Sequence, residues 1–320
     1  MDVSDRVVLR FLAAPGDTTI TSGVVSAGRL LEWIDKAAYA CAVGWSHDYC
    51  VTAYVGNVGF RRPVRPGELV EVRARIVQTG RTSMHVLVSV RSRDPGADDF
   101  RGEAMHCLAV MVAVDANGHP TEVPQWEPNS VRELDLPELI AERVVLRRRI
   151  QEAMLAASYT EAGTAPRTTL RFLAAPADVN FGGKVHGGTV MRWIDEAGYA
   201  CAAGWSSPNA VAVYAGGIQF AAPMRIGDVV EVDARLIHTT ERSMHVAIEA
   251  RSAPLHSPSV PIRNARCIVV YVVPEAGAAL PVPRYVPTTP EDRALDAHAR
   301  ELIALRTQIP PLPEAVLVDE

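Results

Sequence analysis

An internal repeat constrains the fold of this chain more than any other feature of its 320 residues. Residues 9–15 read LRFLAAP, and the same seven letters return at residues 170–176. Three further blocks return downstream: WID at 33–35 and 193–195, YACA at 39–42 and 199–202, and SMHV at 83–86 and 243–246. Self-similarity of this kind indicates that the same structural unit is built twice.

Length and composition agree with two globular domains. Domains commonly take roughly 150 residues, so a chain of 320 residues has room for two. Hydrophobic residues make up 48% and charged residues 22%, as is usual for a globular protein that buries a core. Each half is long enough to bury a core of its own.

Charge, cysteine spacing and hydropathy exclude several classes of function. The formal net charge of −5 leaves no basic surplus to neutralise phosphates, so we expect no nucleic-acid partner. The five cysteines show no C-x-x-C spacing, and we expect them to be buried, reduced thiols rather than metal ligands or redox pairs. The first residues form no apolar signal segment, and no apolar run is long enough to span a membrane. We therefore expect a cytoplasmic protein.

Each repeat has the same order of expected elements. In the first half a strand at 7–12 is followed by a long helix at 27–45 and by strands at 54–60, 69–77, 84–90 and 104–114. The second half repeats this with a strand at 168–172, a helix at 187–205 and later strands that include 244–250 and 265–273. The helix at 27–45 is apolar on nearly every face, so it should be buried on most sides. One buried helix followed by an antiparallel meander predicts an α+β fold, with a curved sheet wrapped around one helix.

The remaining segments differ in kind from the repeats. Residues 127–166 contain a stretch at 138–157 rich in Glu and Arg, and the tail contains a second charged stretch that starts at Pro290. We expect both to form surface helices. The expected division is domain 1 at 1–126, a linker with a surface helix at 127–166, domain 2 at 167–288, and a C-terminal helix and tail at 289–320.

One stretch breaks the repeat. The second half reads N-F-G-G-K-V-H-G-G at residues 180–188, followed by WIDE at 193–196. The buried helix, this loop and this acid together resemble the acyl-CoA thioesterases of the hotdog fold, and most closely those with two hotdog domains in one chain. The resemblance covers residues 5–125 and 167–287.

The resemblance implies an activity and an assembly. The expected reaction is hydrolysis of acyl-CoA to a free acid and coenzyme A, with acyl-CoA as the partner, no metal and no other cofactor. Related double hotdogs often assemble as trimers. Active sites in the family lie between hotdog domains, where the loop of one domain faces the helix acid of the other. That acid is a general base on water or a nucleophile.

The chemistry of the loop residues fits this reaction. A helix start offers unpaired N–H groups, and Gly187 and Gly188 let a carbonyl oxygen approach them closely. We expect the Gly188 amide to be the main oxyanion donor. Asn180 can hydrogen-bond water and substrate, although asparagine is also a common turn residue. His186 can be an acid or base, or it can simply orient the start of the helix.

The two helix acids, Asp35 and Asp195, need a partner or a cavity because a buried carboxylate is otherwise costly. The first-half loop has Ser26 and Ala27 where the second has His186 and Gly187, and Ile20 or, after a one-residue slip, Thr19 in place of Asn180. The hypothesis is one competent site formed by Asn180 and Asp35, and one degenerate site that contains Asp195.

Residues at the start of the fourth strand of each half are candidate contacts for the substrate. In the family this region lies near the path of coenzyme A. The candidates are Arg81, Thr82, Ser83, Arg242 and Ser243, and the two arginines suit phosphate groups. A solvated charge is the simpler interpretation of either arginine.

Two other functions remain open. A hotdog enoyl-thioester hydratase or dehydratase would use a His–Asp or His–Glu pair and would not need this asparagine. A non-catalytic acyl-CoA-binding protein is compatible with the altered first loop, but the intact second loop argues against it.

Overall fold

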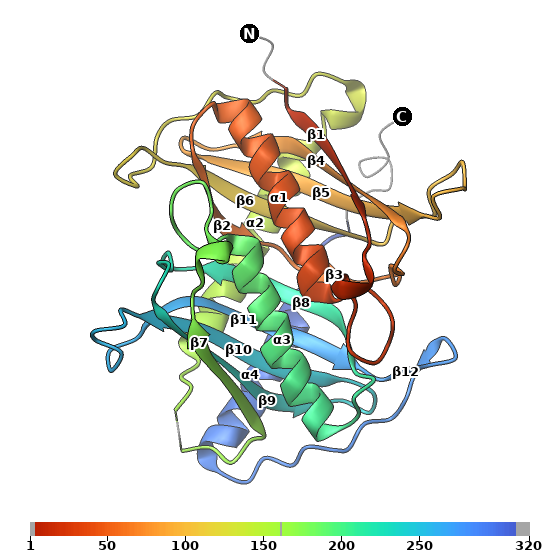
Figure 1. Cartoon of the computed structure of the whole chain (residues 1–320), viewed down its shortest axis with the longest axis vertical. Coiled ribbons are helices and arrows are strands. Elements are labelled where there is room, and N and C mark those ends of the chain that lie inside the picture. The colour runs from red at the N-terminus through yellow and green to blue at the C-terminus, as the bar shows by residue number, and fades with distance from the viewer. Residues whose placement is uncertain (1–3, 161, 312–320) are drawn as a thin grey trace.

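The computed structural model describes residues 4–160 and 162–311, and it contains the predicted unit twice (Figure 1). In the first half β1 (Arg6–Leu12) leads to the long helix α1 (Ala27–Ser46), and in the second β7 (Arg167–Leu173) leads to α3 (Gly187–Trp205). The strands that follow are β2 (Cys50–Val55), β3 (Val58–Gly59), β4 (Leu69–Thr79), β5 (Ser83–Arg93) and β6 (Met105–Ala113), then β8 (Val211–Phe220), β9 (Val229–Thr239), β10 (Met244–Ala253) and β11 (Ile262–Val272). The helices α2 (Leu136–Ala156) and α4 (Pro290–Arg306) complete the main elements.

The two halves share one antiparallel sheet. Its order is β1-β4-β5-β6-β2-β8-β11-β10-β9-β7, and β3 also pairs with β8. The halves join where β2 meets β8, through Tyr54 opposite Gln219 and Val55 opposite Ile218. A curved sheet therefore wraps one long helix in each half, and the predicted tandem hotdog, an α+β fold, is confirmed (Figure 1).

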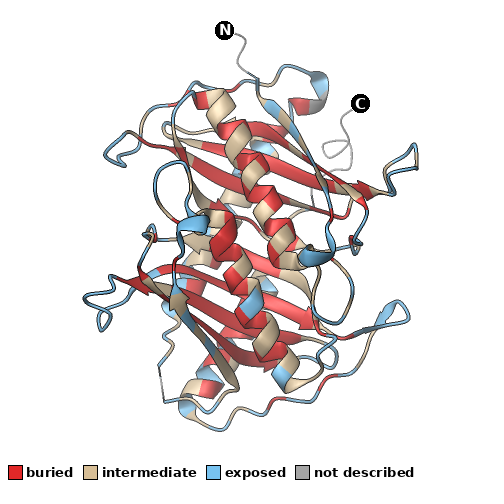
Figure 2. Ribbon diagram, in the orientation of Figure 1, coloured by how far each residue is buried: buried red, intermediate tan, exposed pale blue. Residues whose placement is uncertain are grey.

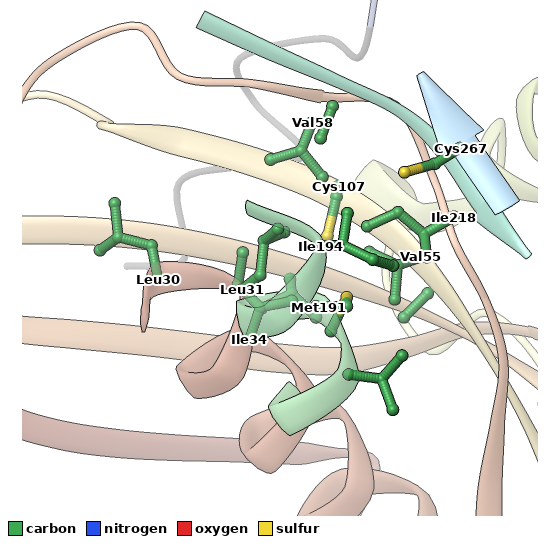
Figure 3. Close-up of a cluster of buried hydrophobic side chains, with 14 of the residues drawn as sticks. Leu30, Leu31, Ile34, Val55, Val58, Cys107, Met191, Ile194, Ile218 and Cys267 are labelled. Carbon is green, nitrogen blue, oxygen red and sulfur yellow. The ribbon is translucent and has the colours of Figure 1, made fainter. Parts of the chain in front are cut away.

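The core continues from one half into the other. Buried apolar side chains of α1 and α3, among them Ile34, Met191 and Ile194, belong to the same cluster as Val55 and Ile218 of the joining strands (Figure 3). Figure 2 shows buried residues recurring along both helices, which lie over a largely buried sheet. This shared core holds the start of each helix in a fixed position against the other half.

The two helices cross so closely that glycine is required at the crossing. A Cβ atom on Gly188 would lie 2.8 Å from Cα of Glu32, and one on Gly28 would lie 2.8 Å from Cα of Arg192. Real Cβ atoms essentially never approach backbone atoms at this distance. Each helix start is thus held against the second turn of the opposite helix, next to Asp35 and Asp195.

Two expectations need correction. The strand predicted at 54–60 is split into β2 and β3, because Gly56 donates its N–H to the carbonyl of Leu108 while β3 turns to pair with β8. The helix α2 is also less exposed than predicted. It buries an apolar stripe at Leu136, Ile140, Ile150 and Met154. The helix α4, also predicted at the surface, buries Leu295, Ala299 and Leu302 against the same cluster as Ile150 and Met154. None of the helices among the described residues is long and apolar enough to cross a membrane.

Candidate active site between the halves

Asp35 is the centre of a hydrogen-bonded cluster that draws on both halves. It lies in α1, and its side chain is almost fully buried. Its Oδ2 accepts the backbone N–H of Gly188 at 2.7 Å and lies 2.9 Å from Nδ1 of His186. Its Oδ1 accepts the hydroxyl of Thr52 at 2.6 Å. The loop of the second half and the acid of the first half therefore meet in one place.

The start of α3 explains how His186 and Gly188 come together. His186 is the N-cap residue of α3, and its Nδ1 lies 3.1 Å from the Gly188 nitrogen. Burial alone lowers the pKa of His186, but the hydrogen bond to Asp35 and the charge of that carboxylate outweigh it, so the pKa lies above its ordinary value. When Nδ1 carries a proton it donates its N–H to Asp35, and when it does not it accepts the Gly188 N–H as the N-cap of α3.

Gly187 keeps space open beside the acid. A Cβ atom there would lie 3.1 Å from Oδ2 of Asp35 and 3.2 Å from Oγ1 of Thr52. These distances are tighter than ordinary contacts. The missing side chain therefore lets the loop backbone pack directly against the carboxylate.

Asn180 lies in the same loop but shapes it with its side chain. Its Oδ1 accepts the N–H of Gly182 at 2.9 Å and that of Lys184 at 3.0 Å. Burial raises the pKa of Tyr49, and the amide of Asn180 close by partly offsets this. The oxygen of Asn180 therefore holds the turn, and Gly182 of the same turn packs against the ring of Tyr49, three residues before Thr52.

Thr52 is the site residue that sequence reasoning missed. It lies in β2 opposite Met111 of β6. The repeat contains a sequence signal for Thr52: the two halves differ here, with a hydroxyl side chain at Thr52 and alanine at the equivalent Ala212. This difference is visible only when the two halves are compared position by position along the strand.

Asp195 is held in a related but simpler way. Its Oδ2 accepts the N–H of Gly28 at 2.8 Å, and the hydroxyl of Tyr271 lies 3.3 Å from its Oδ1. Tyr271 stands opposite Ala212, so a tyrosine on the neighbouring strand replaces the threonine donor of the first site. Burial raises the pKa of Asp195 to about 6, against smaller lowering effects of the Gly28 amide and the Tyr271 hydroxyl.

The first-half loop also lacks the imidazole and the amide that His186 and Asn180 provide in the second-half loop. Ser26 is the N-cap residue of α1, and its hydroxyl accepts from Arg29 rather than contacting Asp195. Thr19 donates its N–H to Val24 as Asn180 does to Lys184, so Thr19, and not Ile20, is the structural counterpart of Asn180. Ile20 is largely exposed.

The candidate coenzyme A contacts lie in the turns before β5 and β10. Arg81 is exposed and lies 3.7 Å from Glu122, and Arg242 is exposed and lies 3.6 Å from Glu241. The hydroxyl of Ser243 lies 2.6 Å from that of Thr240, and the carbonyl of Thr82 accepts the N–H of Ala113. Ser83 begins β5 and faces a cavity described below. Contact of these five residues with coenzyme A stays a prediction.

Comparison with known proteins places both repeats in one family. The family model described as the thioesterase superfamily matches residues 22–98 and 182–258, once in each half. Acyl-CoA thioester hydrolase YciA of Escherichia coli (strain K12) is 34% identical over 120 residues, which cover 37% of this chain and 90% of that protein. The cytosolic acyl coenzyme A thioester hydrolase of Homo sapiens is 26% identical over 298 residues, which cover 87% of this chain and 77% of the human one.

A solved structure shows the same tandem arrangement. It is the crystal structure of a provisionally named oleoyl thioesterase from Lactobacillus plantarum, with a TM-score of 0.59 and 10% sequence identity. The match covers 88% of this chain and 98% of that one. At this identity the likeness concerns the fold alone.

Proposed function

The chain belongs to the thioesterase superfamily, and from this premise we propose that it hydrolyses acyl-CoA thioesters to a free carboxylic acid and coenzyme A. The observation that carries the proposal is the contact between Asp35 and the start of α3, which brings an acid and a helix N-terminus together at one point. The relatives named as acyl-CoA thioester hydrolases support the substrate class.

The first step exchanges one hydrogen bond. The Gly188 N–H is donated to Asp35 in the free protein. We propose that the thioester carbonyl oxygen takes over this N–H, which polarises the carbonyl and frees Oδ2 of Asp35. Thr52 keeps its hydrogen bond to Oδ1 and fixes the orientation of the carboxylate. The helix start then stabilises the negative charge that develops on the carbonyl oxygen.

The second step is attack by water. Asp35 takes a proton from water as the water oxygen bonds to the carbonyl carbon, and the tetrahedral intermediate forms. When the intermediate collapses, the C–S bond breaks and the thiolate of coenzyme A leaves. The proton held by Asp35 passes to the leaving sulfur, so acid and thiol are released and Asp35 returns to its ionised form. We propose that Asn180, whose oxygen is held within the loop, positions the water or the substrate with its amide nitrogen.

We propose that Asp195 does not support turnover. Its cluster lacks the counterparts of Thr52, His186 and Asn180, and Tyr271 fills the space beside it. The second site is therefore a structural remnant of the duplication.

The experiment that tests this function measures release of free thiol from a panel of acyl-CoA substrates with chains of two to eighteen carbons. We expect turnover of at least one member. An enoyl-CoA in the same assay, followed by its ultraviolet absorbance, separates the hydratase alternative. Absorbance loss without thiol release would favour the hydratase, and binding without either change would favour an acyl-CoA-binding protein.

Three further proposals accompany this function. Hydrolysis uses the side chains named above without a metal or other cofactor, so activity should survive treatment with a chelator.

The protein acts in the cytoplasm, in line with the cytosolic human relative. The assembly is a trimer of double hotdogs, and light scattering should give three times the chain mass of 34.6 kDa.

A further inference from the structure

A cavity of about 320 Å³ lies between α2 and the sheet of the first half. Ser83 and His85 of β5 line it, together with Arg147 and Arg148 of α2. Successive residues of a strand point to opposite faces, and Met84 and Val86 pack in the core around α1. The cavity is therefore on the outer face of the sheet, across the strands from Asp35.

The cavity is rich in hydrogen-bond donors. Among the residues that the structure describes, neither ring nitrogen of His85 has a hydrogen-bond partner, although the side chain is only 8% exposed. Burial and then the charges of Arg147 and Arg148 lower the pKa of His85 to about 4, so the ring is neutral at neutral pH and offers one N–H donor. None of the described residues that line the cavity is acidic.

The second half provides an internal comparison for this surface. His245 is the repeat counterpart of His85, and its Nε2 lies 3.3 Å from the hydroxyl of Ser243. Beside it His238, the counterpart of Gln78, pairs with Asp296 of α4 at 2.6 Å. The helix over the second half thus brings an acid that pairs with a histidine, whereas the helix over the first half brings two arginines.

From this geometry we propose that the cavity under α2 binds a phosphate ester, with Arg147, Arg148 and His85 as donors to the phosphate oxygens. Guanidinium groups match the geometry of phosphate and form charge-assisted hydrogen bonds with it. An anion here would give the buried His85 the partner that it lacks.

The size and remaining walls of the cavity favour an ester over the free ion. The volume exceeds what one phosphate group fills, and Val110, Ala141 and Val144 provide apolar walls for an organic group. Arg147 is held in place by Tyr54, since its guanidinium carbon lies 4.9 Å from the centre of the ring. The positive charge is therefore positioned before any ligand arrives.

The test is calorimetric titration of the whole protein with inorganic phosphate and with ADP in a phosphate-free buffer. The variant is Arg148→Gln, and the matched control is Arg149→Gln, which removes an equally exposed charge that does not line the cavity. We expect ADP to bind the wild type, with affinity at least about tenfold weaker in Arg148→Gln and unchanged in Arg149→Gln. All three proteins should melt at the same temperature.

Two results would overturn the proposal: no binding of either probe to the wild type at millimolar concentration, or equal losses in the two variants, which would indicate general attraction by a basic helix. The phosphate ester could be part of coenzyme A or a separate molecule, and a kinetic comparison distinguishes these two sources. If Arg148→Gln also raises KM for acyl-CoA without changing kcat, the phosphate belongs to coenzyme A itself. If ADP binding is lost while KM is unchanged, a separate phosphate ester occupies the cavity.

Discussion

At the scale of single residues, the two helix acids differ in their donors more than in their position. Asp35 receives a threonine hydroxyl from β2, and Asp195 receives a tyrosine hydroxyl from β11. The space for Tyr271 comes from Gly198, where a Cβ atom would lie 2.3 Å from the tyrosine oxygen. The first half has Ala38 and Met111 at these two positions. The two sites therefore keep the same carboxylate but differ together at the two neighbouring positions that decide which hydroxyl reaches it.

The hydroxyl of Thr52 should matter for turnover. Thr52→Val keeps the shape of the side chain and removes the donor to Asp35, so the carboxylate loses a hydrogen bond and its fixed orientation. Hydrogen bonds to charged groups contribute about 1.5–3 kcal/mol, and we expect kcat to fall about 10-fold to 100-fold. Steady-state kinetics with the best acyl-CoA substrate measure this. Tyr271→Phe is the matched control at Asp195 and should leave kcat unchanged, and equal losses would contradict the proposed roles.

Asp195 should reduce stability at neutral and alkaline pH. Its pKa of about 6 in the folded chain lies above its ordinary value of 3.8, so the folded state binds this proton more tightly than the unfolded state does. Stability from this group is complete below pH about 4 and is lost as the pH rises through about 6. Asp195→Asn removes the ionisation and can still accept the Gly28 N–H. We expect its melting temperature to exceed that of the wild type at pH 8 and to approach it at pH 4.

Sequence reasoning reached some of these residues and missed others for a physical reason. The family resemblance predicted that Asp35 lies close to Gly187 and Gly188, because in the family the loop of one domain faces the helix acid of the other. Thr52 was missed because threonine is common in strands, and its hydroxyl acquires a role only through the packing of β2 against α1. Asparagine is a common turn residue, and the structure shows the Asn180 oxygen in that role.

At the scale of elements, the crossing of α1 and α3 builds the site. Helix bounds could be predicted closely because an apolar helix with glycines at its start is a strong local signal. The break between β2 and β3 could not, since it depends on pairing with β8 of the other half. The apolar stripe of α2 was hidden among its many charges, and only contact with the sheet reveals it.

The close approach of the helices predicts a strong effect of one methyl group. In Gly188→Ala the new Cβ meets the backbone of α1 at Glu32, so the helices must separate. We expect a loss of about 1–3 kcal/mol in the free energy of unfolding, measured by chemical denaturation. Gly204→Ala is the control on the same helix, because a Cβ atom there would have no neighbouring atom within 4 Å. That change should be neutral or stabilise by about 0.5–1 kcal/mol, and similar losses in both variants would contradict the account.

At the scale of the whole molecule, the two repeats form one sheet, and their buried helices pack together near their starts. The second half supplies the loop with Asn180, His186 and Gly188, and the first half supplies Asp35 and Thr52. The repeat made the two-domain architecture predictable from sequence alone. The continuity of the sheet through β2 and β8 could not be predicted, because neither strand shows a pattern that identifies its partner.

This division between the halves is tested most directly by comparing Asp35→Asn with Asp195→Asn in a thiol-release assay on the same acyl-CoA. Both changes keep the size of the side chain and remove its charge. We predict that Asp35→Asn lowers kcat by at least about 100-fold, as expected for loss of a general base, and that Asp195→Asn retains wild-type turnover. Loss of activity in Asp195→Asn with full activity in Asp35→Asn would contradict the account.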